Sequence, residues 1–205
     1  MELYFAPERR LAPSPSRSGV DEAEVDLSVG AGQRSRWRTL LCPFLHADGK
    51  GRSAKGYVVY ESDPLDVDLV VAGNPILVLS LASNATDSAI IAYLEDVEPG
   101  GKAHLLSEGE LRTLNATRLV DCDGRPPIVL ASYRRKDAVA LAPGKLATHA
   151  IELLPLAMRF RRGHRLRLVL GGADVDHFTT PPGPERVTWS LELSGSKLIL
   201  PVLPQ

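Results

Sequence analysis

The chain has 205 residues, of which 44% are hydrophobic and 24% charged, and its formal net charge is -1. These values are typical of a soluble globular protein, and the length suits one all-β domain. The balanced charge argues against nucleic-acid binding, which usually needs a net basic face. No apolar run approaches the roughly 20 residues that span a bilayer, so no membrane partner is expected. Residues 1–10 lack the apolar centre of a signal peptide, which favours a cytoplasmic protein.

Proline and glycine, which interrupt regular secondary structure, indicate many short helices or strands in this chain. The 16 prolines and 17 glycines are scattered along the chain rather than clustered. Long helices do not tolerate this pattern, whereas short strands joined by turns do. Only Cys42 and Cys122 are present, which is neither a disulfide framework nor a zinc site. We therefore expect no metal and no cofactor.

The N-terminal part lacks clear periodicity. Residues 6–36 are rich in Pro, Ser, Arg and Gly, which predicts an irregular, extended lead-in. We expect one domain over residues 1–205, in which residues 1–55 form this lead-in and a first strand. Residues 56–205 then form the main sandwich.

Strand patterns begin at Gly56. Gly56–Tyr60 is β-branched and aromatic, and Gly73–Pro75 predicts a turn. Ile76–Ala82 is apolar on both alternating sets, as in a strand that is covered on both faces. Ala89–Val97 predicts another strand, ended by the turn signal Glu98–Gly101.

The later elements alternate more regularly. Leu166, Leu168 and Leu170 oppose arginines, and the segment Trp189–Ser194 alternates in the same way, as half-buried strands do. Leu198–Leu203 predicts a final edge strand, since Pro201 is tolerated only at an edge.

One segment, Glu108–Asn115, has a weak helical pattern that Gly109 disfavours. Many short strands with frequent turns predict an all-β fold, a sandwich or jelly roll.

Five phrases of the sequence, taken in order, resemble motifs of one known family. They are GYVVYESDPL with VAGNP (56–75), AYLEDVEPGG (92–101), SEGELR (107–112), FRRGHRLRL (160–168) and SKLILPV (196–202). Together they are similar to the C-terminal domain of serine hydrolases of the X-Pro dipeptidyl-peptidase and cocaine-esterase (CocE/NonD) type. The opening Leu3–Phe5 also fits the first strand of that domain.

The resemblance implies a jelly-roll β-sandwich like the galactose-binding domains. In the family this domain packs on an α/β-hydrolase domain, whose Ser-Asp-His triad hydrolyses an ester or peptide bond. That catalytic domain has no counterpart in this sequence, so no catalytic residue can be assigned and the chain alone is predicted to be inactive. The implied function is an accessory one: covering the active-site cleft of the hydrolase and supporting assembly.

Three groups of residues could carry chemistry of their own. Gly51–Lys55 approaches the G-x-S-x-G nucleophile elbow, but it lies in a polar turn with no helix behind it. Asp174–His177 and Asp121–Gly124 offer oxygen ligands for calcium, although neither has EF-hand spacing and both suit ordinary turns. His164 is an acid/base at a domain interface or, as we favour, a partly buried histidine that hydrogen-bonds across strands.

Two surface features concern partners. The arginines between Arg159 and Arg167 could contact phosphates, but alternation favours a solvated or ion-paired face. The apolar segment 40–45 lies in a loop-like setting, and such a segment needs cover. Its residues Leu41, Pro43, Phe44 and Leu45 form either an interdomain or substrate-proximal loop or simple packing under the sandwich.

Two other functions remain open. A stand-alone carbohydrate-binding jelly roll would stack sugars on exposed aromatics, for which Trp37 is the candidate because Trp189 alternates with the core set. A protein-interaction subunit would use its uncovered patch to form a homo-oligomer.

Overall fold

The computed structural model describes residues 1–30 and 56–204, and this part of the chain is all-β. Its strands in the N-terminal half are β1 (Glu2–Ala6), β2 (Arg10–Ala12), β3 (Val20–Val25), β4 (Val58–Ser62), β5 (Leu69–Gly73), β6 (Ile76–Ser83) and β7 (Ala89–Val97). They continue with β8 (Ala103–Arg112), β9 (Ala116–Cys122), β10 (Arg125–Ser132), β11 (Ala147–Glu152), β12 (Leu156–Phe160), β13 (Arg165–Gly171) and β14 (Val187–Ile199).

Helix is limited, in this part of the chain, to the single 3-10 turns Pro7–Arg9 and Arg135–Asp137. None of the described helices is long and apolar enough to cross a bilayer.

One large mixed sheet organises the molecule. Its ten strands follow the order β11-β6-β14-β1-β2-β4-β13-β7-β8, with β3 paired to β14 off this path. All neighbours are antiparallel except β2 and β4, which run parallel with Arg10 opposite Glu61. The order is far from sequential, so crossovers link the two halves of the sheet. Two small sheets, β9-β10 and β5-β12, complete the fold.

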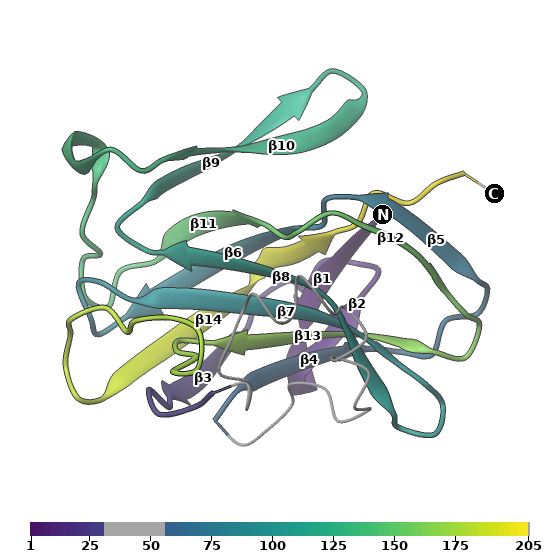
Figure 1. Cartoon of the computed structure of the whole chain (residues 1–205), viewed down its shortest axis with the longest axis horizontal. Coiled ribbons are helices and arrows are strands. Elements are labelled where there is room, and N and C mark those ends of the chain that lie inside the picture. The colour runs from purple at the N-terminus through teal and green to yellow at the C-terminus, as the bar shows by residue number, and fades with distance from the viewer. Residues whose placement is uncertain (31–55, 205) are drawn as a thin grey trace.

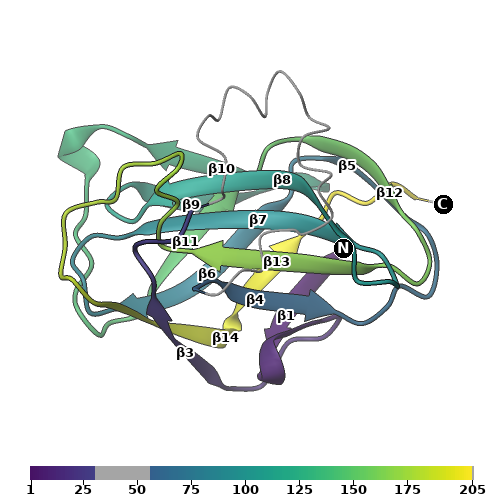
Figure 2. The same ribbon diagram turned by 60° about the horizontal axis from the view of Figure 1, so that its bottom comes forward.

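The large sheet curls around a single core (Figures 1 and 2). Buried side chains from both halves join in one cluster, such as Leu79 and Leu191 from one half and Leu94 and Leu168 from the other. The two ends of the sheet approach each other through the segment after β11, where Leu154 N donates to the carbonyl of Glu108 over 2.8 Å. The expectation of an all-β fold is confirmed.

The strands that the sequence predicts most strongly are confirmed. Every residue of β6 is buried, and it lies between β11 and β14 within the sheet. In β13, Leu166, Leu168 and Leu170 are fully buried in the core while Arg165 and Arg167 point to the other face. Trp189 of β14 is fully buried as well, which agrees with its alternation.

Three local predictions are wrong. The lead-in over residues 6–36 was expected to be irregular, yet Arg10–Ala12 and Val20–Val25 are strands of the large sheet, held by β1 and β14. The segment from Glu108 belongs to strand β8 rather than to a helix, because pairing with β7 overrides the propensity of Glu, Leu and Arg. Leu198 is not on a separate edge strand: β14 continues through it, between β1 and β6.

A two-stranded arm stands beside the curled sheet. In Figure 1 the hairpin β9-β10 lies above β11 and points away from the body. Its strands pair only with each other, with Leu119 opposite Val129 and Arg118 opposite Leu130. Ile128 and Leu130 are each 47% exposed. An isolated hairpin is marginally stable in water, so the arm depends on its contacts with the body.

Candidate functional site

A second apolar cluster lies on the outer face of the sheet, on the opposite side of β7 and β13 from the main core. Its buried members include Tyr57, Ile91, Tyr93 and Val169. The rings of Tyr57 and Tyr93 meet edge to face, with centroids 6.2 Å apart. Outer faces of half-buried sheets are usually polar and wet, so a second buried cluster distinguishes this face of the sheet.

A hydrogen-bonded trio of side chains is embedded in this outer cluster. Tyr93 Oη donates to Asp174 Oδ2 over 2.6 Å, and His177 Nδ1 lies 2.9 Å from the same oxygen. The Asp174 side chain is fully buried and that of His177 is 5% exposed. Burial, followed by the hydrogen bond to Asp174, raises the pKa of Tyr93 far above its ordinary value, so Tyr93 stays a neutral donor.

The chain after β13 folds tightly to bring Asp174 to this place. The amides of His177 and Phe178 both donate to the carbonyl of Asp174, over 3.0 and 2.8 Å. Val175 N donates to the carbonyl of Val29 over 2.9 Å. Gly30 has no room for a side chain, since a Cβ atom there would lie 2.3 Å from Asp176 Oδ2. Residues 29–30 are therefore pressed against the turn that holds Asp174.

The described residues on either side of segment 31–55 lie close to the outer cluster. The residue that precedes this segment, Gly30, touches Asp176, and Tyr57, just beyond its other end, contacts Tyr93. Both flanks of the segment therefore lie at the outer cluster.

Charged side chains continue the same face along the strands. Arg167 Nε lies 2.8 Å from Glu61 Oε2, and Arg167 Nη1 lies 3.6 Å from Glu95 Oε2. Glu95 is fully buried and the Arg167 side chain is 15% exposed, whereas Arg165, next to Glu61, is 42% exposed. This ladder across β4, β13 and β7 confirms that these arginines pair with acidic neighbours rather than forming a free basic patch.

The histidine of the Gly-His-Arg phrase is explained by a cross-strand contact. His164 Nδ1 lies 2.9 Å from Asp96 Oδ1 of β7. Nearby, His104 Nε2 lies 2.7 Å from Glu98 Oε1, and this hydrogen bond lowers the pKa of Glu98. The favoured interpretation of His164, a partly buried hydrogen-bonding residue, is confirmed.

Several sequence candidates fall on the part of the chain outside the described residues. They are Leu41, Pro43, Phe44 and Leu45 of the apolar loop, Gly51–Lys55 and Trp37.

The calcium candidates are within the described residues. Asp174 is engaged by Tyr93, and Asp123 and Gly124 form the β9-β10 turn with positive φ angles of 46° and 81°. Among the described residues, no group of three or more His, Cys, Asp or Glu side chains could hold a metal ion.

The described residues also lack a serine or cysteine activated by a neighbouring histidine. Asp174 and His177 form an acid–histidine pair, but none of the hydrogen bonds among residues 1–30 and 56–204 joins a serine or cysteine side chain to a histidine. A nucleophile needs such a base within hydrogen-bond reach. The described part of the chain therefore contains no arrangement for nucleophilic catalysis.

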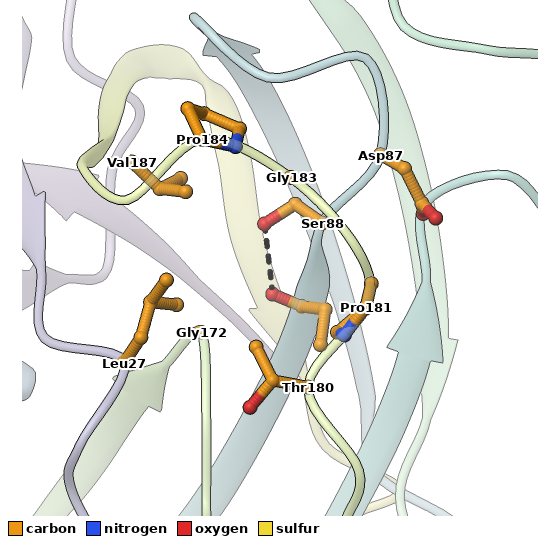
Figure 3. Close-up of a pocket in the computed structure, with 10 residues that line it drawn as sticks. Leu27, Asp87, Ser88, Gly172, Thr180, Pro181, Gly183, Pro184 and Val187 are labelled. Carbon is orange, nitrogen blue, oxygen red and sulfur yellow. Dashed lines mark hydrogen bonds between the residues drawn. The ribbon is translucent and has the colours of Figure 1, made fainter.

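A small pocket opens beside β7, under the proline-rich segment 180–184 (Figure 3). Leu27, Ser88, Thr180 and Val187 are among its lining residues, and Ser88 Oγ donates to the carbonyl of Ala89 over 3.3 Å. Its volume is about 50 Å³. That is room for a few water molecules and not for a sugar or an amino acid. This pocket does not support a stand-alone binding module.

The geometry defines a class of protein: an all-β domain with a second buried cluster on the outer face of its sheet, and with no nucleophile–histidine arrangement in the described residues. The chain belongs to the family of X-Pro dipeptidyl-peptidase C-terminal non-catalytic domains, whose family model matches residues 16–200. The resemblance of the five sequence phrases to this family is thereby confirmed.

Similar proteins place the domain within longer chains. The chain is 36% identical over 211 residues to "Putative serine esterase Mb1866c" of Mycobacterium bovis, and equally to a Mycobacterium tuberculosis protein of the same description. These alignments cover 98% of this chain and 33% of each relative. The chain thus spans about a third of the length of the curated relatives it matches.

Solved structures show the same fold. An aminopeptidase from a marine sediment Thaumarchaeota archaeon superposes with a TM-score of 0.74 at 19% identity, over 99% of this chain and 36% of that one. An α-amino acid ester hydrolase gives a TM-score of 0.73 at 18% identity, over 98% and 36%. A CocE/NonD family hydrolase from Staphylococcus aureus gives 0.69 at 16% identity, over 99% and 36%. The chain therefore matches about a third of the length of each of these solved structures as well.

The Tyr93–Asp174–His177 trio is the part that sequence reasoning missed. Asp174 and His177 stood out only as calcium candidates, because their spacing in one turn is visible in the sequence. Tyr93 lies 81 residues from Asp174. The only sequence signal for it was a tyrosine within the predicted strand Ala89–Val97.

Proposed function

We propose that this chain is the accessory β-domain of a serine hydrolase that cleaves an ester or peptide bond. The α/β-hydrolase part packs against its outer cluster, and the apolar loop 40–45 forms part of the wall of the active-site cleft. The finer fold is a jelly roll of the galactose-binding type. The observation that carries this proposal is the family match over residues 16–200 in a chain that spans a third of its esterase relatives.

The choice of contact surface rests on the outer face. Tyr57, Tyr93 and Val169 are already buried within the chain, so the contact is made by the exposed surface around them. In this proposal Phe44 and Leu45 of the apolar loop meet the neighbouring domain.

The carbohydrate alternative has less support. Trp189 is fully buried in the core and cannot stack on a sugar. Assembly into a homo-oligomer is a separate proposal, for which the exposed Ile128 and Leu130 of the arm are the natural contact residues.

The first test asks whether the native polypeptide is a serine hydrolase. An antibody to this domain is used to precipitate protein from source cells, and the precipitate is treated with a fluorophosphonate probe that labels active-site serines. We expect a labelled band far above the 22.2 kDa of this chain. A precipitate without any labelled serine hydrolase would refute the proposal.

The second test concerns the contact surface. Phe44→Glu in the native polypeptide is expected to lower ester hydrolysis and to speed proteolytic separation of the domains. Val67→Glu is the matched control, because Val67 is 63% exposed in the β4–β5 connection, beyond the opposite end of β4 from Tyr57. Equal behaviour of the two variants would show that the apolar loop does not face the catalytic domain.

A further inference from the structure

The largest cavity among those described lies at the base of the arm, away from the outer cluster. Its volume is about 330 Å³. It is bordered by the start of β9, the start of β11 and the segment that connects β10 to β11, and it is open to solvent. The volume falls within the range of about 300–1,000 Å³ that is usual for small-molecule sites.

The connecting segment is held in place by backbone hydrogen bonds, so the cavity is a built feature. Val139 N donates to the carbonyl of Leu114 over 3.0 Å, and Leu141 N donates to that of Thr86 over 2.8 Å. Gly144 N donates to the carbonyl of Ser83 over 2.8 Å. These bonds fix the segment to the end of β6 and to the chain between β8 and β9.

A buried histidine in the cavity wall lacks a partner. His149 of β11 is 5% exposed and lies on the core side of its strand, opposite Leu79. Its Nε2 atom is shielded from bulk solvent and has no hydrogen-bond partner. Burial lowers the pKa of His149, so the ring is neutral at pH 7 and carries one N–H donor. In the observed ring orientation Nε2 is not accessible from the cavity, so donation to a guest requires a half-turn of the ring, which exchanges Nε2 with Cε1.

The polar part of the wall is rich in donors and positive in charge. Lys145 lines the cavity and makes no ion pair with a described residue. Asn115 and Thr148 add an amide and a hydroxyl. None of the described residues that line this cavity is acidic. The neighbouring cavity of about 90 Å³, by contrast, is lined by Glu110 and Glu152.

The remaining wall is apolar. Val139 and Leu146 are 64% and 54% exposed, while Leu141 is 6% exposed and forms the deeper part. A guest that suits this wall has one anionic group for Lys145 and His149 and a short apolar body for the leucines and valine. A phosphate without an apolar part would leave half of the wall uncovered.

We propose that the cavity between the arm and β11 binds a small organic carboxylate, with Lys145 as the charge partner and Val139 and Leu146 around the apolar body. His149 becomes a hydrogen-bond donor to this guest after a half-turn of its ring. This site is separate from the outer cluster, and the proposal does not depend on the proposed function.

The test uses the 205-residue chain and three simple probes: benzoate, its neutral analogue benzamide, and inorganic phosphate. Binding is followed by ¹⁵N–¹H chemical shifts. We expect saturable shifts with benzoate, at amides of Val139, Lys145 and Thr148 and at their neighbours, with a dissociation constant in the millimolar range. Benzamide is expected to bind more weakly because it cannot pair with Lys145, and phosphate because it lacks an apolar body.

Two variants assign the roles, with a matched control. Lys145→Gln is expected to weaken benzoate binding about fivefold, as for a partly screened ion pair. His149→Phe, which keeps the ring volume, is expected to weaken it about tenfold by removing a charge-assisted hydrogen bond. Lys102→Gln, at the β7-β8 turn, leaves binding unchanged.

Three outcomes would overturn the proposal: no saturable shift, equal affinity for benzoate and benzamide, or shifts that gather elsewhere. Because Lys145 is exposed in a turn, its variant folds even if His149→Phe does not, so the test stands on Lys145 alone.

Discussion

Strands β7 and β13 have buried residues on both faces, but the two faces are built differently. The inner face is mainly apolar, with residues such as Leu94 and Leu168. The outer face mixes apolar rings with a buried acid, a buried ion ladder and the Tyr93–Asp174–His177 trio. Apolar packing has no preferred direction, whereas hydrogen bonds and ion pairs fix orientation. The inner face therefore supplies stability, and the outer face fixes the turn after β13 against strands β7 and β13.

The largest expected effect comes from the inner face. Leu168→Ala removes a fully buried side chain from the core and leaves a cavity, which should lower the free energy of unfolding by about 2–5 kcal/mol. Urea denaturation followed by circular dichroism measures it. Leu154→Ala is the control, because Leu154 is 49% exposed, and it should change stability by less than about 0.5 kcal/mol. Equal losses would mean that the inner face is not the main source of stability.

The ion ladder of the outer face offers a matched pair on one strand. Arg167→Ala removes the arginine between Glu61 and the fully buried Glu95, and should cost about 2–3 kcal/mol, as for hydrogen bonds to buried charged groups. Arg165→Ala should cost less than about 0.5 kcal/mol, because its pair with Glu61 is exposed to solvent. Thermal unfolding of both variants in low and high salt tests this. A similar loss in both would show that burial does not distinguish them.

A smaller effect is expected at the trio. Tyr93→Phe keeps the ring but removes the hydroxyl that donates to Asp174, which should lower stability by about 1–2 kcal/mol. Tyr133→Phe is the control, since Tyr133 is 73% exposed. Double-mutant cycles with Asp174→Asn measure the coupling. Additive losses would mean that the Tyr93–Asp174 hydrogen bond contributes no stability of its own.

The smallest expected effect depends on pH. Burial lowers the pKa of His149 in the folded chain, so the unfolded chain takes up a proton first as the pH falls below about 6.5. This residue therefore makes the free energy of unfolding fall as the pH drops through that value, and it contributes no slope at higher pH. The stability of His149→Phe should vary less than that of the wild type between about pH 5 and 7. Identical slopes would show that His149 titrates alike in both states.

The sequence predicts a strand where burial of one or both faces produces a periodic pattern of hydrophobic residues. In β6 both alternating sets of residues are apolar, which indicates burial on both faces. In β13 leucines alternate with arginines, which indicates burial on one face. Strand β3 gives no such signal, because Val20–Val25 is half acidic and is held by pairing with β14. Gly109 was read as a helix breaker, yet its small size serves a close approach: a Cβ there would lie 2.9 Å from the carbonyl oxygen of Glu152.

The candidate site was less predictable, because its members come together only in space. Turn residues such as Asp174 and His177 are conspicuous in one short phrase, but their function as partners of Tyr93 depends on the β7–β13 pairing. His149 gave no signal at all, since its surroundings are set by β6 and by the segment before β11.

The pairing of the first and last strands determines how the domain responds to mechanical force. β1 lies antiparallel to β14 with Glu2 opposite Ile199, and the Met1 ammonium donates to the carbonyl of Leu200 over 2.9 Å. Tension between the two chain ends therefore acts at one end of this strand pair and breaks its hydrogen bonds one after another. Strands loaded in shear must break all their bonds together. Pulled by its termini in a single-molecule experiment, the domain should yield at low force, with β1 leaving first.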